Sequence, residues 1–173
     1  VDKRDLLNRV STSTAFILPS NICGSYVEKD LWYFPTIYDS TNAFGIYHDI
    51  YDTYIGNLGT LEIFGLSGLF QGGGGAFITT NSDEVASKLQ GLSTPLSEFS
   101  AALALTNLEH IEDIQSHQFN IWSYFKQQLP SEVLVISPNA YFSNYNEILI
   151  LVPGTLKSAI VSSGVAESLS TVL

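Results

Sequence analysis

The stretch from residue 36 to residue 80 constrains the fold more than any other part of the sequence. It contains three short runs of β-branched and aromatic residues bounded by turn residues, at 36–38, 61–64 and 76–80. Runs of this kind predict buried strands. The first run ends on Asp39, and α/β folds place their ligands beside polar groups at the carboxyl ends of parallel strands. The stretch therefore predicts an α/β fold with the floor of a binding site at Asp39.

Composition places the chain among globular proteins of one ordinary domain. It has 173 residues, of which 45% are hydrophobic and only 14% are charged, so a substantial core is possible and disorder is not expected. The net charge is −10, with seven Lys and Arg in all. We therefore expect no nucleic acid and no anionic membrane among the partners, because a basic patch is needed to neutralise phosphates.

Cysteine usage and hydropathy predict a cytoplasmic protein. Cys23 is the one cysteine, so no disulfide can form within the chain, and we interpret it as a small buried hydrophobe rather than a nucleophile. No apolar run reaches the roughly 20 residues that span a bilayer, and no signal-peptide pattern opens the chain. The chain lacks methionine even at position 1, which predicts a fragment or a processed piece.

The remaining elements follow from periodicity and capping residues. The predicted helices are 1–9 with Leu6 and Leu7 inward, 81–90 capped by Asn81 or Ser82, a long one from Ser97 almost to Pro130, and 154–163; the further strands are 15–18, 133–136 and 147–152. Residues 26–34 have room for at most two helical turns. His110 and His117 lie beside the apolar stripe of the long helix, and we interpret both as solvated or half-buried structural residues.

Residues 45–59 alternate weakly and contain three tyrosines and three glycines, which is typical of a hairpin or a loop. His48, Asp49 and Asp52 in this segment are of residue types that bind metals. Their spacing matches no standard ligand pattern, so we interpret them as polar residues of a tyrosine-rich surface loop.

Five segments in order resemble the DegT/DnrJ/StrS family of PLP-dependent sugar aminotransferases. They are residues 1–24, which match a helix, turn, strand and loop ending in Gly24; IYDSTNAFG; the segment from GNLGTLEIFG to DEVASKL; LSEFSAALALTNLEHIEDI; and the strand–strand–helix tail. The resemblance implies an α/β type I aminotransferase fold with a mainly parallel sheet. It implies a partial large PLP-binding domain at 1–105, a linking helix at 106–130, and the start of a small α+β domain at 131–173.

The resemblance also assigns cofactor-binding residues. Asp39 matches the carboxylate that pairs with the pyridine nitrogen of pyridoxal 5′-phosphate, where it keeps the ring protonated as an electron sink. Asn42 matches a histidine or glutamine near the ring. Two simpler interpretations stand beside these: Asp39 as the N-cap of a following helix, and the four glycines at 72–75 as a flexible turn rather than a phosphate cradle.

Several functional positions of the family are changed in this sequence. Phe70 matches the Schiff-base lysine, and phenylalanine can neither form the imine nor move a proton. Gly65 matches a serine that helps hold the cofactor phosphate, and Gly73 matches an acidic residue. Ser93 and Pro95 match an asparagine and an arginine. Asn21 and Cys23 replace a histidine and a tyrosine.

The resemblance predicts a protein of amino-sugar biosynthesis that takes a nucleotide-linked keto-sugar and an amino donor, with transamination impaired by Phe70. The alternative is an inactive homologue that serves as a structural protein or dimer partner, as a homodimer or heterodimer, because the family forms its sites across a dimer interface. Exposed apolar faces would favour such association.

Overall fold

A computed structural model describes residues 3–28, 33–48, 52–67, 74–92, 94–138 and 143–164. The elements in chain order are α1 (Lys3–Arg9), β1 (Ile37–Asp39), β2 (Tyr47–His48), β3 (Thr53–Tyr54), β4 (Leu61–Gly65), β5 (Ala76–Thr79), α2 (Asp83–Gln90), α3 (Glu98–Glu109), α4 (Ile111–Gln128), β6 (Leu134–Ile136), β7 (Leu149–Leu151) and α5 (Gly154–Ser162). None of these helices is long and apolar enough to cross a membrane. Five consecutive strands are followed by three helices and then by a strand–strand–helix tail, so the described chain combines strands and helices as predicted for its α/β fold class.

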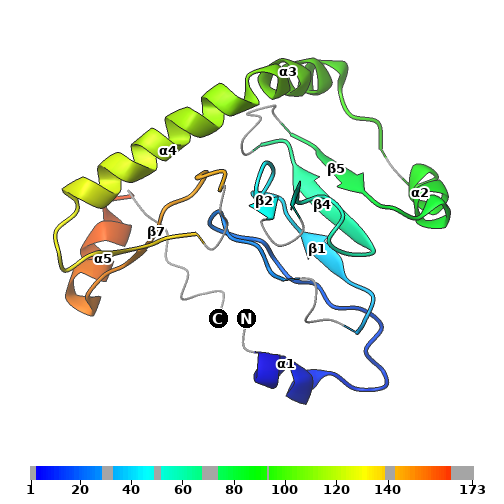
Figure 1. Cartoon of the computed structure of the whole chain (residues 1–173), viewed down its shortest axis with the longest axis horizontal. Coiled ribbons are helices and arrows are strands. Elements are labelled where there is room, and N and C mark those ends of the chain that lie inside the picture. The colour runs from blue at the N-terminus through cyan, green and yellow to red at the C-terminus, as the bar shows by residue number, and fades with distance from the viewer. Residues whose placement is uncertain are drawn as a thin grey trace.

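The central sheet has the order β1-β4-β5 and is mixed. β1 and β4 are parallel, with Ile37 opposite Leu61 and Asp39 opposite Ile63. β5 returns antiparallel to β4. All three strands were predicted from the sequence, and their parallel pair brings the carboxyl ends of β1 and β4 to one edge of the sheet, where the predicted site lies (Figure 1).

The predicted buried strand at 15–18 is wrong in part. The segment runs beside β1 but forms only two isolated parallel bridges, Ile17 with Thr36 and Ser20 with Asp39. The ladder is interrupted because Pro19 has no N–H to donate between those bridges. Phe16 and Leu18 are 52% and 57% exposed, so this outer segment is not buried.

The core lies between the sheet and the loops that follow β1. It is formed by Tyr26, Tyr38, Ala43, Ile46, Ile55, Leu58 and Phe64. Phe64 stacks on Phe77 with ring centroids 5.1 Å apart and meets Phe44 edge-on at 5.6 Å. β4 alternates half-buried and buried residues, as expected of a strand that packs one face on the core.

β2 and β3 form the antiparallel hairpin predicted within residues 45–59. His48 in this hairpin is fully buried, and its ring lies 4.0 Å from the ring of Tyr26. The interpretation of His48 as a surface residue is therefore wrong. Asp49 lies outside the described residues, Asp52 accepts a hydrogen bond from the Tyr47 hydroxyl, and no cluster of three metal-ligating residues occurs in the part of the chain that the structure describes.

The single long helix predicted from Ser97 is in fact two helices, α3 and α4, which follow one another along one side of the molecule (Figure 1). They part at His110, whose ψ of 18° is not helical and whose N–H bonds back to the carbonyl of Asn107. Nothing in the local sequence marks this break. Ser100 and Trp122 are the buried residues of the two helices, and Leu108, Ile121 and Phe125 of the predicted inward stripe are more than 40% exposed.

The remaining elements agree closely with their predicted positions. Ser82 caps α2, with its side chain accepting from the N–H of Val85. α1 is confirmed, but Leu7 is half exposed rather than inward. β6 and β7 pair antiparallel and lead into α5, so the chain ends in the strand–strand–helix unit that the sequence indicated.

Candidate functional site

The candidate site lies where β1 ends at the sheet edge. Asp39 is the last residue of β1 and is half-buried. Its Oδ1 accepts from the backbone N–H of Thr41 at 3.2 Å and from the Thr41 hydroxyl, and its Oδ2 accepts from the Ser20 hydroxyl at 3.4 Å. Turns rather than a helix follow Asp39, so the simpler interpretation as a helix N-cap is wrong.

Asn42 lies in the turn after β1 and its side chain is directed at the C-terminal part of the chain. Its Nδ2 donates to Glu147 Oε1 at 3.1 Å. Its backbone carbonyl accepts from the Nδ2 of Asn144 at 2.8 Å. Both predicted site residues therefore lie on one loop, but Asp39 is held by neighbours of the sheet edge and Asn42 by residues more than 100 positions away.

The loop at 21–24 lies beside the end of β1, with the N–H of Asn21 donating to the Asp39 carbonyl at 2.8 Å, and Cys23 in this loop is half-buried. Its backbone N–H donates to Glu147 Oε2 at 3.1 Å. Burial, and then the negative charge and hydrogen bonding of Glu147, raises the pKa of the Cys23 thiol to about 11. The thiol therefore stays protonated at neutral pH, as the interpretation of Cys23 as an inert small residue requires.

A buried polar network lies beneath this edge, and the sequence analysis missed it. Glu62 of β4 is 0% exposed. Ser40 donates to Glu62 Oε1 at 2.5 Å, and Asn21 Nδ2 donates to Ser40 Oγ at 2.8 Å. The N–H of Leu58 reaches the other carboxylate oxygen at 3.4 Å. Burial raises the pKa of Glu62, and the hydrogen bonds from Ser40 and the backbone only partly oppose this shift.

One signal for this network was present in the sequence. Side chains two apart in a strand share a face, so Glu62 had to share the core-facing side of β4 with Phe64. No comparable signal marked Glu147, because its contacts with Cys23 and Asn42 bridge distant parts of the chain.

Gly65, which the resemblance matches to a phosphate-holding serine, has no room for a side chain. A Cβ at Gly65 would stand 2.9 Å from the carbonyl oxygen of Thr41 and 2.6 Å from its methyl group. The same backbones are joined by the N–H of Gly65, which donates to the Thr41 carbonyl at 3.1 Å. Any side chain at position 65 would therefore push the loop after Asp39 away from β4.

The other changed positions of the resemblance lie partly outside the described residues, namely Phe70, Gly73 and Ser93. Lysines with described side chains occupy helices rather than the loops of Asp39 and Asn42: Lys88 pairs with Glu84 on α2 at 2.6 Å, Lys126 lies over the Trp122 ring on α4, and Lys157 belongs to α5. The described part of the sheet edge thus offers a carboxylate and an amide but no amine.

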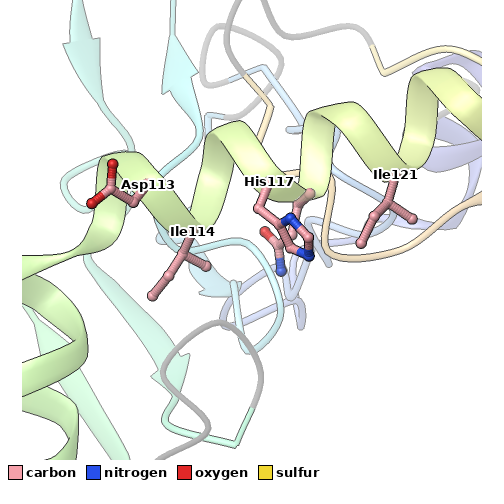
Figure 2. Close-up of a pocket in the computed structure, with 5 residues that line it drawn as sticks. Asp113, Ile114, His117 and Ile121 are labelled. Carbon is pink, nitrogen blue, oxygen red and sulfur yellow. The ribbon is translucent and has the colours of Figure 1, made fainter.

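A separate groove of about 490 Å³ lies along α4, lined by Asp113, Ile114, His117, Gln118 and Ile121. Figure 2 shows four of these side chains along α4 itself. His117 is exposed and His110 lies 3.9 Å from the Asp113 carboxylate. Both histidines are solvated, in agreement with their structural interpretation, and neither belongs to the loops of the sheet edge.

Solved structures with the same fold are found, although no protein-family model matches the chain and no curated protein matches it. The sugar enzyme DesI, solved in the presence of its TDP-sugar product, has a TM-score of 0.77 at 16% identity, over 91% of this chain and 47% of that one. Helicobacter pylori PseC, an aminotransferase involved in pseudoaminic acid biosynthesis, has a TM-score of 0.78 at 16% identity, over 94% and 53%. The E. coli GDP-4-keto-6-deoxy-D-mannose-3-dehydratase, solved with bound hydrated PLP, has a TM-score of 0.72 at 15% identity, over 95% of this chain and 55% of that one.

These similarities establish the fold. The chain has part of the type I PLP-dependent aminotransferase fold, as the sequence resemblance implied. It spans about half the length of the enzymes that it matches.

The sheet edge fits a pyridine ring in one respect and not in another. Asp39 Oδ2 has one long contact, with Ser20 at 3.4 Å, which leaves it able to accept from a protonated ring nitrogen. The amide of Asn42, in contrast, is already bonded to Glu147. Asp39 therefore offers an oxygen that fits the nitrogen end of PLP, whereas the amide of Asn42 is engaged by the Glu147 carboxylate.

Proposed function

We propose that the protein belongs to the DegT/DnrJ/StrS family of PLP-dependent enzymes for nucleotide-linked keto-sugars, and that this chain does not itself transaminate. The observation that carries the proposal is the Asp39 carboxylate at the carboxyl end of β1, within a fold shared with sugar aminotransferases. When bound, PLP supplies an electron sink. Asp39 would hold its ring nitrogen and Asn42 would lie near the ring.

Loss of transamination follows from the residue types on the chain. The reaction needs an amine that links to the cofactor and moves a proton, and Phe70 takes the place of that lysine in the resemblance. On this proposal, residues 1–105 are part of a large domain, 106–130 are the link and 131–173 begin a small domain. The substrates of the family, a nucleotide-sugar and an amino donor, would then be bound without being converted.

The test is an absorbance scan after PLP is added to the folded protein, followed by borohydride reduction and mass spectrometry. We expect weak, reversible PLP binding that Asp39→Asn diminishes, and no mass increase after reduction on any of the five lysines of the chain. A stable adduct on one lysine, together with turnover of an amino donor, would show that the chain is an active aminotransferase. Absence of PLP binding at millimolar concentration would remove the cofactor from the proposal.

A second function is favoured by the apolar side chains on α3. Phe99 and Leu105 are 75% and 63% exposed, and large exposed apolar side chains favour association when they gather into a patch. We propose as the alternative that the chain is a structural or dimer-partner protein, pairing with itself or with an active relative. Sedimentation velocity of the protein alone tests self-association: a dimer that Leu105→Ser dissociates supports it, and a monomer at high concentration contradicts it.

A further inference from the structure

Residues 143–147 form a short segment that touches both the sheet edge and α4. Ser143 and Asn144 are buried and the other three are half-buried. The segment precedes β7 and, in Figure 1, lies between α4 and the loops around β2. It therefore links the loops of the sheet edge to α4.

The contacts with the sheet edge are polar and close. Asn144 Nδ2 donates to the carbonyls of Asn42 at 2.8 Å and Phe44 at 3.1 Å. Ser143 lies directly against Gly24, where a Cβ would stand 2.0 Å from the serine Oγ. Gly24 has φ +71°, so the loop keeps a glycine here both for its conformation and for the approach of Ser143.

The contacts with α4 are aromatic. The ring of Tyr145 lies 5.1 Å from that of Phe119 and 5.3 Å from that of Trp122. Gln118 Nε2 lies 3.5 Å from Asn146 Oδ1. Trp122 is the buried residue of α4, and the Tyr145 ring of this segment is one of the groups that lie against it.

The backbone of the segment is held in an unusual conformation. Tyr145 has φ +47°, which is costly for an aromatic residue. Two side chains of the segment brace it: Ser143 Oγ accepts from the N–H of Tyr145 at 3.1 Å, and Asn144 Oδ1 accepts from the N–H of Asn146 at 3.3 Å. These hydrogen bonds and the packing of the segment stabilise the costly backbone conformation of Tyr145.

We infer that residues 143–147 are a latch: the carboxylate of Glu147 occupies a carboxylate-binding site formed by the Cys23 N–H and the Asn42 amide, and so closes the candidate site in cis. Each carboxylate oxygen takes one donor, Oε2 from Cys23 and Oε1 from Asn42, both at 3.1 Å. Hydrogen bonds to an ionised acceptor are about twice as strong as neutral ones. The inference rests on the proposed function in one respect, namely that the site covered by Glu147 is the one that would hold the cofactor ring.

The latch predicts competition between Glu147 and a pyridine ring. Removal of the carboxylate frees the Asn42 amide and the Cys23 N–H and loosens the segment over Trp122. A pyridine ring that binds beside Asn42 must displace the Glu147 carboxylate and its two charged hydrogen bonds. Loss of these hydrogen bonds should therefore raise the affinity for the ring about tenfold. It should also raise the exposure of the Trp122 indole.

The test compares Glu147→Ala and Glu147→Gln with wild type and with the control Glu132→Ala, which removes an exposed carboxylate near β6. All four carry Trp32→Phe, so that Trp122 is the single tryptophan. One readout is acrylamide quenching of Trp122. The other is equilibrium dialysis of pyridoxamine 5′-phosphate, which forms no imine with lysines.

We expect Glu147→Ala to raise both quenching and ligand affinity, Glu147→Gln to do so less, and the control to match wild type. Quenching that is unchanged in Glu147→Ala overturns the latch, whatever the ligand does. Raised quenching without ligand binding in any variant supports the latch and removes the cofactor from the proposed function. Circular dichroism confirms that each variant is folded, and Glu147→Gln keeps the test decisive if Glu147→Ala is not.

Discussion

The sheet edge and the helical pair α3–α4 bury their apolar residues to very different degrees. Tyr38, Ile46, Leu58 and Phe64 near the sheet are at most 1% exposed. On α3 and α4 the buried residues are Ser100 and Trp122. Both regions are rich in apolar residues, so composition does not make the difference. Side chains on paired strands and their loops bury one another, whereas a helix face is buried only where another element covers it.

Polar residues differ between the two regions in the same way. At the sheet edge, Asn21, Ser40, Glu62 and Asn144 are buried and hydrogen-bonded to one another or to backbone carbonyls. At the start of α4, the side chains of His110 and Asp113 are both exposed. The sheet edge is therefore the place where a single substitution leaves a polar group unsatisfied, which is the costly kind of change.

The largest expected effect is on the free energy of unfolding when an aromatic core residue is truncated. Phe64→Ala removes a ring packed on Phe77 and Phe44 and should cost about 3–5 kcal/mol, enough to unfold a marginally stable domain. Phe99→Ala on α3 should change it by less than about 0.5 kcal/mol, because Phe99 is exposed. Urea denaturation followed by circular dichroism measures both.

The pair of variants is a direct test of the comparison between the regions. Equal losses for Phe64→Ala and Phe99→Ala would mean that α3 is covered in solution, by a second copy or by another protein. Repeating the Phe99→Ala measurement at two protein concentrations distinguishes these cases, since only self-association makes stability depend on concentration.

The next effect is on the pH dependence of stability, through Glu62. Its pKa is raised in the folded protein by burial above the unfolded value of about 4.3, so the folded state binds more protons. The contribution of Glu62 to the free energy of unfolding is therefore greatest at low pH. It falls as the pH rises from the pKa of the unfolded state through that of the folded state. Each unit of the shift corresponds to about 1.4 kcal/mol.

Glu62→Gln removes this titration while keeping an amide that can bond to Ser40. We expect the variant to lose the fall in melting temperature with rising pH, and to exceed wild type in stability on the alkaline side. Glu84→Gln, at an exposed residue of α2 paired with Lys88, is the matched control and should follow wild type. A melting temperature of Glu62→Gln that falls with pH as in wild type would assign the dependence to another group.

Much of the fold could be predicted from the sequence, because local residue patterns determine most of its strands and helices. The strands at 37–39, 61–65 and 76–79 were predicted from short runs at 36–38, 61–64 and 76–80 between turn residues. The cap of α2 was predicted at Asn81 or Ser82 and lies at Ser82. The failures came from long-range effects. The strand at 15–18 was predicted as buried, but Phe16 and Leu18 are exposed, and the break at His110 has no local signal.

The site was predictable only where one residue type at one position carries the chemistry. Asp39 stood out because it ends a strand. The partners that decide what Asp39 and Asn42 do, Ser20 and Glu147, come from other parts of the chain. A carboxylate that bonds across more than 100 residues leaves no periodic trace, so Glu147 was found only from the structure.

The smallest expected effect is on reactivity, not stability, and it reports how closed the sheet edge is. With a pKa of about 11, Cys23 is almost entirely protonated at neutral pH, and the thiolate is the reactive form. Alkylation by iodoacetamide should therefore be far slower in the folded protein than in urea, where the thiol returns to about pKa 8.5. Glu147→Gln should speed the reaction without much loss of stability, because a charge that raises this pKa is removed. A folded-state rate equal to the urea rate would mean that the loop at 21–24 opens freely, and that the sheet edge is no better closed than the exposed face of α3.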